Sequence, residues 1–143
     1  MSENKNIGFL LIGLKTEQFA IFEDNYSPKK ETKINTGLEF KLSSEVRRVG
    51  VFTEFTFSQG KNAFVKLQTS CHFNISPESW DSFCSDSKIV FPKDFMMHLT
   101  MLAIGTARGV LHTKTEGTIF NQFLLPTINV EELIAEDVEF NIN

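Results

Sequence analysis

Three histidines and two cysteines are the side chains of this sequence best suited to metal or acid–base chemistry. His98 and His112 are fourteen residues apart on one predicted helix, which is not the i, i+4 spacing that brings two imidazoles to one metal ion. Cys71 and His72 are adjacent on a predicted strand. Neither they nor Cys84 belong to a Cys-x-x-Cys pair, and a fourth ligand is not evident. We therefore expect no metal site and interpret Cys71 as a core thiol.

Nucleophilic catalysis has no better support in the sequence. A Cys–His pair would require the fold to bring Cys84 to His98 or His112, and nothing in the local sequence indicates this. The carboxylates Glu131 and Glu132 lie at a predicted helix N-terminus, where they stabilise the positive end of the helix dipole. We predict that the protein is not an enzyme and uses no cofactor.

Length, charge and hydropathy limit the remaining classes of fold and function. We expect a single domain over 1–143, because this length supports one core. Fourteen basic residues dispersed among eighteen acidic ones form no basic cluster, so we predict no nucleic-acid binding. The apolar run Ile7–Leu14 is too short for a membrane span or an export signal. With no export signal, Cys71 and Cys84 are expected to be reduced, in a cytoplasmic protein.

Four segments alternate apolar and polar residues with period two, which predicts half-buried strands. They run over about 9–22, 34–42, 49–57 and 63–75. The loop 58–62 contains a glycine and has hairpin length, so the third and fourth strands should be antiparallel neighbours.

Helical periodicity replaces this alternation after residue 75. Ser76 followed by Pro77 predicts a short helix, and a long helix should begin at Pro92 and end near Gly117. An extended connector from Ile119 to Pro126 should precede a last short helix capped at Asn129. We predict an α+β fold, with a four-stranded antiparallel sheet packed on one side by the long helix and the short C-terminal helix.

The long helix is apolar around its whole circumference between Phe95 and Leu111. One sheet can cover only one side of such a helix, so the other side requires a partner. Met96, Met97 and Met101 fall within six residues, and methionine adapts to irregular or varying apolar surfaces. We expect one face to pack on the sheet and the other to meet a second subunit, a client polypeptide or both.

A small-residue patch interrupts the bulky residues of this helix: Ala103, Gly105, Thr106 and Gly109. Such a patch allows another helix to approach closely, which predicts helix packing across a dimer axis. The alternative is a local kink, since each glycine costs about 1 kcal/mol relative to alanine in a helix.

The order of elements resembles the SecB family of export chaperones, over roughly residues 8–135. The matching features are the four strands, Ala63-Phe64-Val65 opening the last strand, Phe91-Pro92 before the long helix, and Leu125-Pro126-Thr127-Ile128-Asn129 before a helix containing Glu132-Leu133. The resemblance implies a dimer or dimer of dimers, assembled through helices and sheet edges, that holds unfolded or precursor polypeptides without nucleotide.

The resemblance also implies client contacts on apolar surface between the long helix, the connector and the loop after the first strand. By position the client-binding residues would be Phe22, Tyr26, Met97, Met101, Ile104, Phe120, Phe123 and Leu124. Exposed Met- and Phe-rich surface suits a protein that must tolerate many client sequences. Ordinary core or oligomer packing is the alternative for each of these residues.

Three positions depart from the family pattern. The family contacts the SecA motor through acidic residues on the outer sheet face, where this chain has Gln18, Phe22 and Leu67. A divergent SecB-like chaperone that serves an antitoxin or one exported client is therefore an alternative to a SecA-dependent one. A different class remains open: a small hydrophobic ligand bound in a Phe-lined cavity between sheet and helix.

Overall fold

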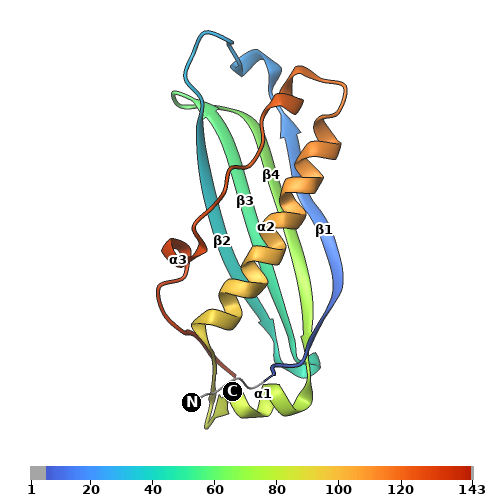
Figure 1. Cartoon of the computed structure of the whole chain (residues 1–143), viewed down its shortest axis with the longest axis vertical. Coiled ribbons are helices and arrows are strands. Elements are labelled where there is room, and N and C mark those ends of the chain that lie inside the picture. Colours follow the sequence, from blue (N-terminus) through green and yellow to red (C-terminus); the bar gives the residue numbers. More distant parts are fainter. Residues whose placement is uncertain (1–5, 143) are drawn as a thin grey trace.

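The computed structural model describes residues 6–142 and contains a four-stranded antiparallel sheet in the order β1-β4-β3-β2 (Figure 1). The strands are β1 (Phe9–Ile21), β2 (Lys33–Ser43), β3 (Arg48–Gln59) and β4 (Asn62–Ile75). Gly60, with a φ of 62°, supplies the left-handed conformation of the turn between β3 and β4. The alternation therefore predicted all four strands, and the α+β class is confirmed.

The helices also begin and end near the predicted signals. The α-helices are α1 (Pro77–Phe83), α2 (Lys93–Thr115) and α3 (Val130–Leu133), and the 3-10 turns are η1 (Glu23–Asn25), η2 (Ser44–Val46) and η3 (Ile119–Gln122). The Ser76 hydroxyl accepts the first-turn N–H of α1 from Ser79. Within the described residues, none of these helices is long and apolar enough to cross a membrane.

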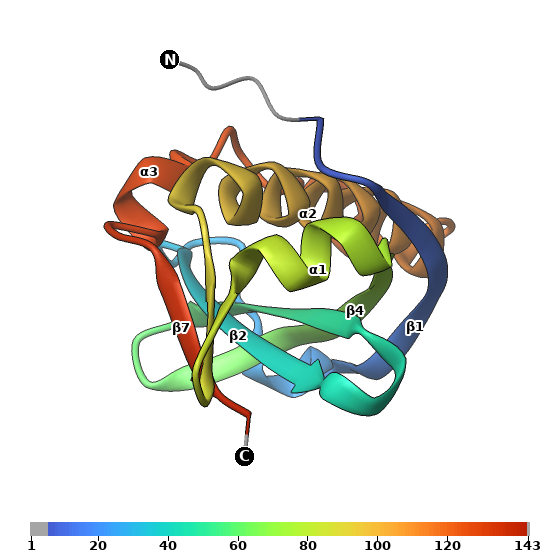
Figure 2. The same cartoon turned by 90° about the horizontal axis from the view of Figure 1, so that it is seen from below.

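Two local predictions are wrong. Residues 119–122 form a 3-10 turn rather than an extended segment. Strands also occur after the first helix, as a second sheet in the order β5-β6-β7, made of β5 (Cys84–Ser85), β6 (Lys88–Phe91) and β7 (Val138–Asn141). Strands of two to four residues are too short to show a period. Together with α1 they close one end of the molecule (Figure 2).

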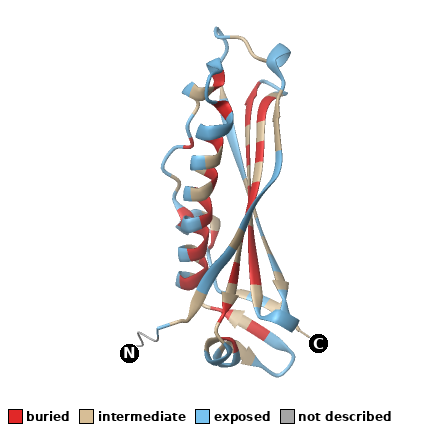
Figure 3. Ribbon diagram, turned by 90° about the vertical axis from the view of Figure 1, so that its right-hand side faces the viewer, coloured by how far each residue is buried: buried red, intermediate tan, exposed pale blue. Residues whose placement is uncertain are grey.

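Helix α2 crosses one face of the large sheet diagonally and packs on β3 and β4 (Figures 1 and 3). The buried side chains form two clusters along the helix, one around Phe73, Phe91 and Phe95 and one around Phe57 and Phe120. A buried hydrogen bond of 3.0 Å joins the hydroxyls of Thr53 and Thr69, on the central strands. Within the large sheet, all of the buried apolar side chains come from these two middle strands, and the helices and the connecting segments supply the rest of the core.

The edge strand β1 is much less covered than the two central strands. Leu11 and Leu14 pair with Phe73 and Cys71 on the face that carries α2, yet both leucines are exposed. Leu10, on the opposite face, is 66% exposed. The opposite edge strand β2 has Lys33, Glu39 and Lys41 along its length, and such charges discourage pairing of a sheet edge with another chain. β1 has two charged residues, Lys15 and Glu17, among its thirteen, and is the more apolar of the two edges.

The segment before the last strand also helps to start α2. Pro92 is the N-cap residue of α2 and has no side chain that can accept a hydrogen bond. The Asp137 carboxylate accepts the Lys93 N–H at 2.8 Å instead, from the segment just before β7. The C-terminal segment therefore caps the long helix.

Replacing this cap is expected to weaken the fold without removing any core contact. Asp137→Ala should lower the free energy of unfolding by about 1 kcal/mol, since it leaves the Lys93 N–H without its carboxylate. Urea denaturation followed by circular dichroism measures this. Glu136→Ala, at the neighbouring exposed position, is the control and should change little. Equal stability of both variants would contradict the capping role.

Candidate functional site

An open groove runs between α2 and residues 123–129. From here on the connector means residues 123–129, because residues 119–122 form the turn η3. Its volume is about 280 Å³. The residues that line it are Met101, Ile104, Arg108, Leu125, Thr127, Ile128 and Val130. Most of these side chains are apolar. We refer to this feature as the α2–connector groove.

Arg108 fixes the width of the groove. Its Nε donates to the Leu125 carbonyl oxygen at 3.1 Å, and its Nη2 donates to the Pro126 carbonyl oxygen at 2.9 Å. Hydrogen bonds from a charged donor are stronger than neutral ones. Sequence reasoning missed this role, because a lone arginine does not indicate which carbonyls it will reach. The connector is therefore tied to α2 through its backbone.

An aromatic cluster anchors the connector at the end of the sheet far from α1. The Tyr26 ring lies 4.9 Å from Phe64, 5.4 Å from Phe120 and 5.7 Å from Phe123, measured between ring centroids. Tyr26 comes from the loop after β1, and Phe123 opens the connector. The cluster therefore joins two segments that are far apart in sequence.

Gln59 holds the loop after β1 in place. Its side-chain oxygen accepts the Ser27 N–H at 2.8 Å, and its amide nitrogen donates to the Ser27 carbonyl at 2.9 Å. The same nitrogen also lies within hydrogen-bond distance of Lys30 and Thr32. Gln59 is buried, so these bonds are shielded from water.

The eight predicted client-binding residues differ widely in exposure. Met101 and Leu124 are each 58% exposed, and Phe22 is also exposed. Tyr26, Met97 and Phe123 are half-buried. Ile104 and Phe120 are buried, at 4% and 1% exposure. The groove brings Met101 and Ile104 together, and the aromatic cluster brings together Tyr26, Phe120 and Phe123. Phe22 lines a separate small cavity beside η1.

The small-residue patch is only partly on the surface. Gly105 and Gly109 are exposed, and within the described chain a methyl group on either would meet no atom within 4 Å beyond its chain neighbours and the adjoining backbone of its own helix. Thr106 is half-buried, with its side chain against the Cys71 thiol. Ala103 is buried in the cluster around Phe95. The surface part of the patch is therefore Gly105, Thr106 and Gly109.

A hydrogen-bonded Ser–His–Glu group lies on the sheet face opposite α2, and sequence reasoning missed it. The Ser70 hydroxyl donates to Glu17 Oε2 at 2.6 Å and lies 2.9 Å from His72 Nε2. Because the serine proton is directed to the glutamate, the histidine must donate to Ser70 and does not act on it as a base. Burial, then Lys15, lowers the pKa of His72, which keeps the imidazole neutral. Ser70 is buried, so the group stabilises the sheet rather than forming a nucleophile.

Metal-ligating side chains do not gather within residues 6–142. Within this range no three His, Cys, Asp or Glu residues are placed to hold a metal ion. Cys71 and Cys84 are free thiols, the first buried and the second half-buried. Burial raises the pKa of the Cys71 thiol. The thiols therefore do not point to a reactive site.

Two solved structures share the arrangement of elements loosely. A SecB-like chaperone of Mycobacterium tuberculosis, in complex with a peptide from the HigA1 antitoxin, is 9% identical, with a TM-score of 0.46 over 84% of this chain and 90% of that one. A protein of unknown function from Streptococcus agalactiae is 12% identical, with a TM-score of 0.41 over 87% of this chain and 100% of that one. No protein-family model and no curated protein matches the sequence.

The role of Arg108 can be measured directly. Arg108→Ala should speed amide hydrogen exchange in residues 124–128 and lower the free energy of unfolding by about 1–2 kcal/mol, because two carbonyls lose a charged donor. Lys114→Ala removes an exposed positive charge from the same helix and should change neither quantity. Unchanged exchange in the connector of Arg108→Ala would show that other contacts hold the groove.

Proposed function

We propose that this protein is an ATP-independent chaperone that holds unfolded or precursor polypeptides on the α2–connector groove. The observation that carries the proposal is the exposure of Met101, which lines the groove, together with the exposure of Leu124, which precedes the lining residue Leu125 on the connector. A protein does not gain stability from leaving large apolar side chains in water. Exposed apolar surface beside a groove is typical of a binding site.

The size of the groove favours a polypeptide over a compact ligand. Small-molecule sites usually have volumes of about 300–1,000 Å³ and enclose most of the ligand. The α2–connector groove is at the lower end of this range, and it is open and bordered by an extended segment. An extended chain could place single apolar side chains in it, and Met101 would adapt to different ones. The proposed activity requires neither a catalytic group nor a cofactor.

The outer sheet face favours a dedicated client over a SecA-dependent pathway. Lys15 and Lys66 lie on the face opposite α2 together with Glu17 and Glu54, so this face has mixed charges rather than the acidic surface that docking on SecA would use. Leu67 is buried on the α2 side instead. We infer that an antitoxin or a single exported protein is a better candidate partner than the SecA motor. The free thiols are consistent with the cytoplasm as its location.

A holdase assay tests the proposal. The protein at stoichiometric amounts should suppress the light scattering of a thermally aggregating client, and the double variant Met101→Ser/Leu124→Ser should suppress it several-fold less. Val46→Ser is the control, because Val46 is also an exposed apolar residue but lies in η2, far from the groove. Failure of the unmodified protein to reduce scattering would refute the chaperone proposal.

We further propose that two copies associate through β1, in keeping with the predicted homo-oligomer. β1 is an edge strand of thirteen residues, so its outward backbone groups can pair with another strand. Antiparallel pairing about a two-fold axis at Thr16 would bring Lys15 of each copy near Glu17 of the other, at the irregularity of β1 between Thr16 and Gln18. Ser70 holds Glu17 on the same face as Lys15. Opposite charges across neighbouring strands stabilise such a pair.

The same axis would bring the exposed part of α2 toward its copy. Thr106 lies against Cys71, and Cys71 pairs with Leu14 of β1. Gly105 and Gly109, on either side of Thr106 in sequence, are therefore on the side of the molecule that contains β1. Pairing of two β1 strands would place this side at the interface. Close approach of two helices there would use the open space beside both glycines.

Charge reversal provides a test of this association that does not depend on chaperone activity. Lys15→Glu and Glu17→Lys should each weaken the dimer about tenfold in sedimentation equilibrium, because each creates two like-charge pairs. The double variant Lys15→Glu/Glu17→Lys should restore it, since the reciprocal pairs re-form. A protein that is monomeric at all concentrations, or single variants that dimerise as well as the unmodified protein, would contradict the β1 interface.

A further inference from the structure

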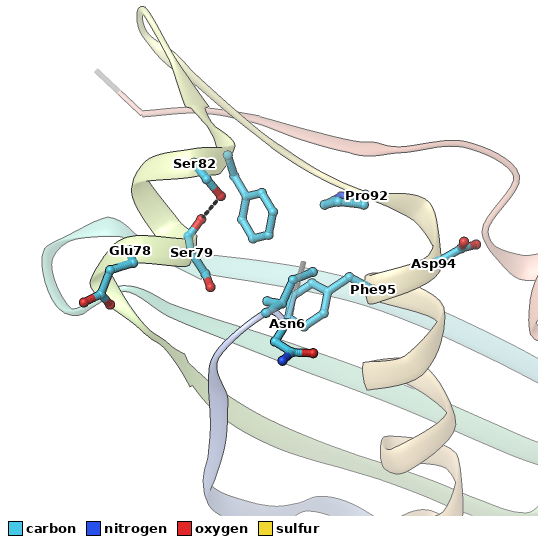
Figure 4. Close-up of a pocket in the computed structure, with 9 residues that line it drawn as sticks. Asn6, Glu78, Ser79, Ser82, Pro92, Asp94 and Phe95 are labelled. Carbon is cyan, nitrogen blue, oxygen red and sulfur yellow. Dashed lines mark hydrogen bonds between the residues drawn. The ribbon is translucent and has the colours of Figure 1, made fainter. Parts of the chain in front are cut away.

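Of the described residues that line the α2–connector groove, only Arg108 is charged, and the others are apolar apart from Thr127. A larger cavity, of about 700 Å³, lies between α1 and the start of α2. The carboxylates beside that cavity, Glu78 and Asp94, point away from it (Figure 4). The groove is therefore the place where a charged side chain and exposed apolar surface lie side by side.

The protein itself uses only one edge of the Arg108 guanidinium group. Arginine has five N–H donors in a planar, rigid arrangement. Nε and Nη2 each donate once, to the carbonyl oxygens of Leu125 and Pro126, and these two donors lie on the same edge of the group. The edge formed by Nη1 and Nη2 has no partner among the described residues. Such an edge matches the two oxygens of a carboxylate.

The positive charge of Arg108 is not neutralised within residues 6–142. Among these residues no carboxylate forms an ion pair with Arg108, including Glu131 and Glu132 at the nearby start of α3, which are both exposed. The two carbonyl groups supply only partial negative charges. Arg108 is half-buried, so water and salt screen its charge less than that of a fully exposed side chain. The groove therefore keeps a positive charge at one end.

The spacing along α2 determines the spacing that a client would need. Ile104 and Arg108 both line the groove and are four residues apart, which is about 6 Å along a helix axis. In an extended chain, residues two positions apart lie on the same side and are separated by about 6.6 Å. The two spacings match. A residue only one position away would point to the opposite side of the client.

We propose that the groove selects extended client segments in which an aspartate or glutamate stands two positions from a large apolar residue, an assignment that rests on the groove being the client site. The apolar side chain packs on Met101 and Ile104, and the carboxylate accepts two hydrogen bonds from the Nη1–Nη2 edge of Arg108. The whole protein has a net charge of −4, so its long-range field disfavours an acidic client. Any preference for one must come from local contact.

Four short peptides test the proposal. Each has a central leucine among serines and is acetylated and amidated, so that side chains supply the only charges. The first has glutamate two positions from the leucine on both sides, which makes it independent of the direction of binding. The second and third have glutamine or lysine at the same positions, and the fourth has both glutamates directly beside the leucine. Amide NMR shifts of Met101, Ile104 and Ile128 in the full chain detect binding down to millimolar affinity.

The first peptide should shift these signals saturably and bind most tightly. The glutamine peptide should bind about fivefold more weakly, as expected of a partly exposed ion pair. The lysine peptide should bind more weakly still, and the peptide with adjacent glutamates should bind no more tightly than the glutamine peptide. The preference for glutamate over glutamine should shrink in high salt.

Variants of Arg108 assign the preference to this side chain. In Arg108→Gln, the glutamate and glutamine peptides should bind equally. Because Arg108 also ties the connector to α2, the affinity of the glutamine peptide serves as the reference for an intact groove, and the ratio of the two affinities is compared. Arg108→Lys keeps the charge without the planar edge and should retain only part of the preference. Lys114→Gln, which removes an exposed charge from the same helix, is the matched control and should keep all of it.

Several results would overturn the proposal. These are equal binding of the glutamate and glutamine peptides, tighter binding of the lysine peptide, equally tight binding when the glutamates adjoin the leucine, and a preference that persists in Arg108→Gln. Binding of every peptide without preference refutes the charge selection alone. The absence of saturable shifts with any peptide refutes the groove as a client site as well, so the two failures are distinguishable.

Discussion

One helix cannot cover a four-stranded sheet, and most features of the exposed apolar surface of this protein follow from that constraint. A helix with its side chains is about 10–12 Å wide, whereas four strands about 4.8 Å apart present a wider face. Helix α2 packs on β3 and β4 and leaves the edge strands partly bare. Leu11 and Leu14 of β1 face the helix side without being covered by it. The exposed apolar surface is thus a geometric consequence of the fold rather than a local irregularity.

The remaining elements extend the cover at the two ends of the sheet but not along β1. At one end, Tyr26 and the connector close over Phe64. At the other end, Trp80 of α1 and Phe140 of β7 pack on Phe91 of β6. Both ends are built from aromatic contacts between segments distant in sequence, which gives each end its own groove or cavity. The uncovered middle of β1 and the outward side of α2 remain available to partners.

The sequence predicted the elements that have a regular alternation of apolar and polar residues or clear helix-capping residues. Alternation gave four strands close to their observed bounds, and Ser76-Pro77 and Gly117 marked helix ends correctly. Strands β5 to β7 left no such signal, because two to four residues cannot show a period and β6 is an apolar run. The sequence also could not tell which side of α2 is buried. Met101 and Ile104 are both apolar, and only the packed sheet distinguishes the exposed residue from the buried one.

The sequence predicted which segments form the candidate site, but not how their side chains and backbone groups contact one another. Its side chains could be named from their apolar character, whereas Arg108, which fixes the groove, is recognisable only once the Leu125 and Pro126 carbonyls are placed. Gly105 and Gly109 raise the opposite problem. Nothing in the described chain requires either glycine, and alanine at each would stabilise the helix by about 1 kcal/mol. The helix packing proposed above would give both glycines a role outside the protomer, because only a partner helix would use the open space beside them.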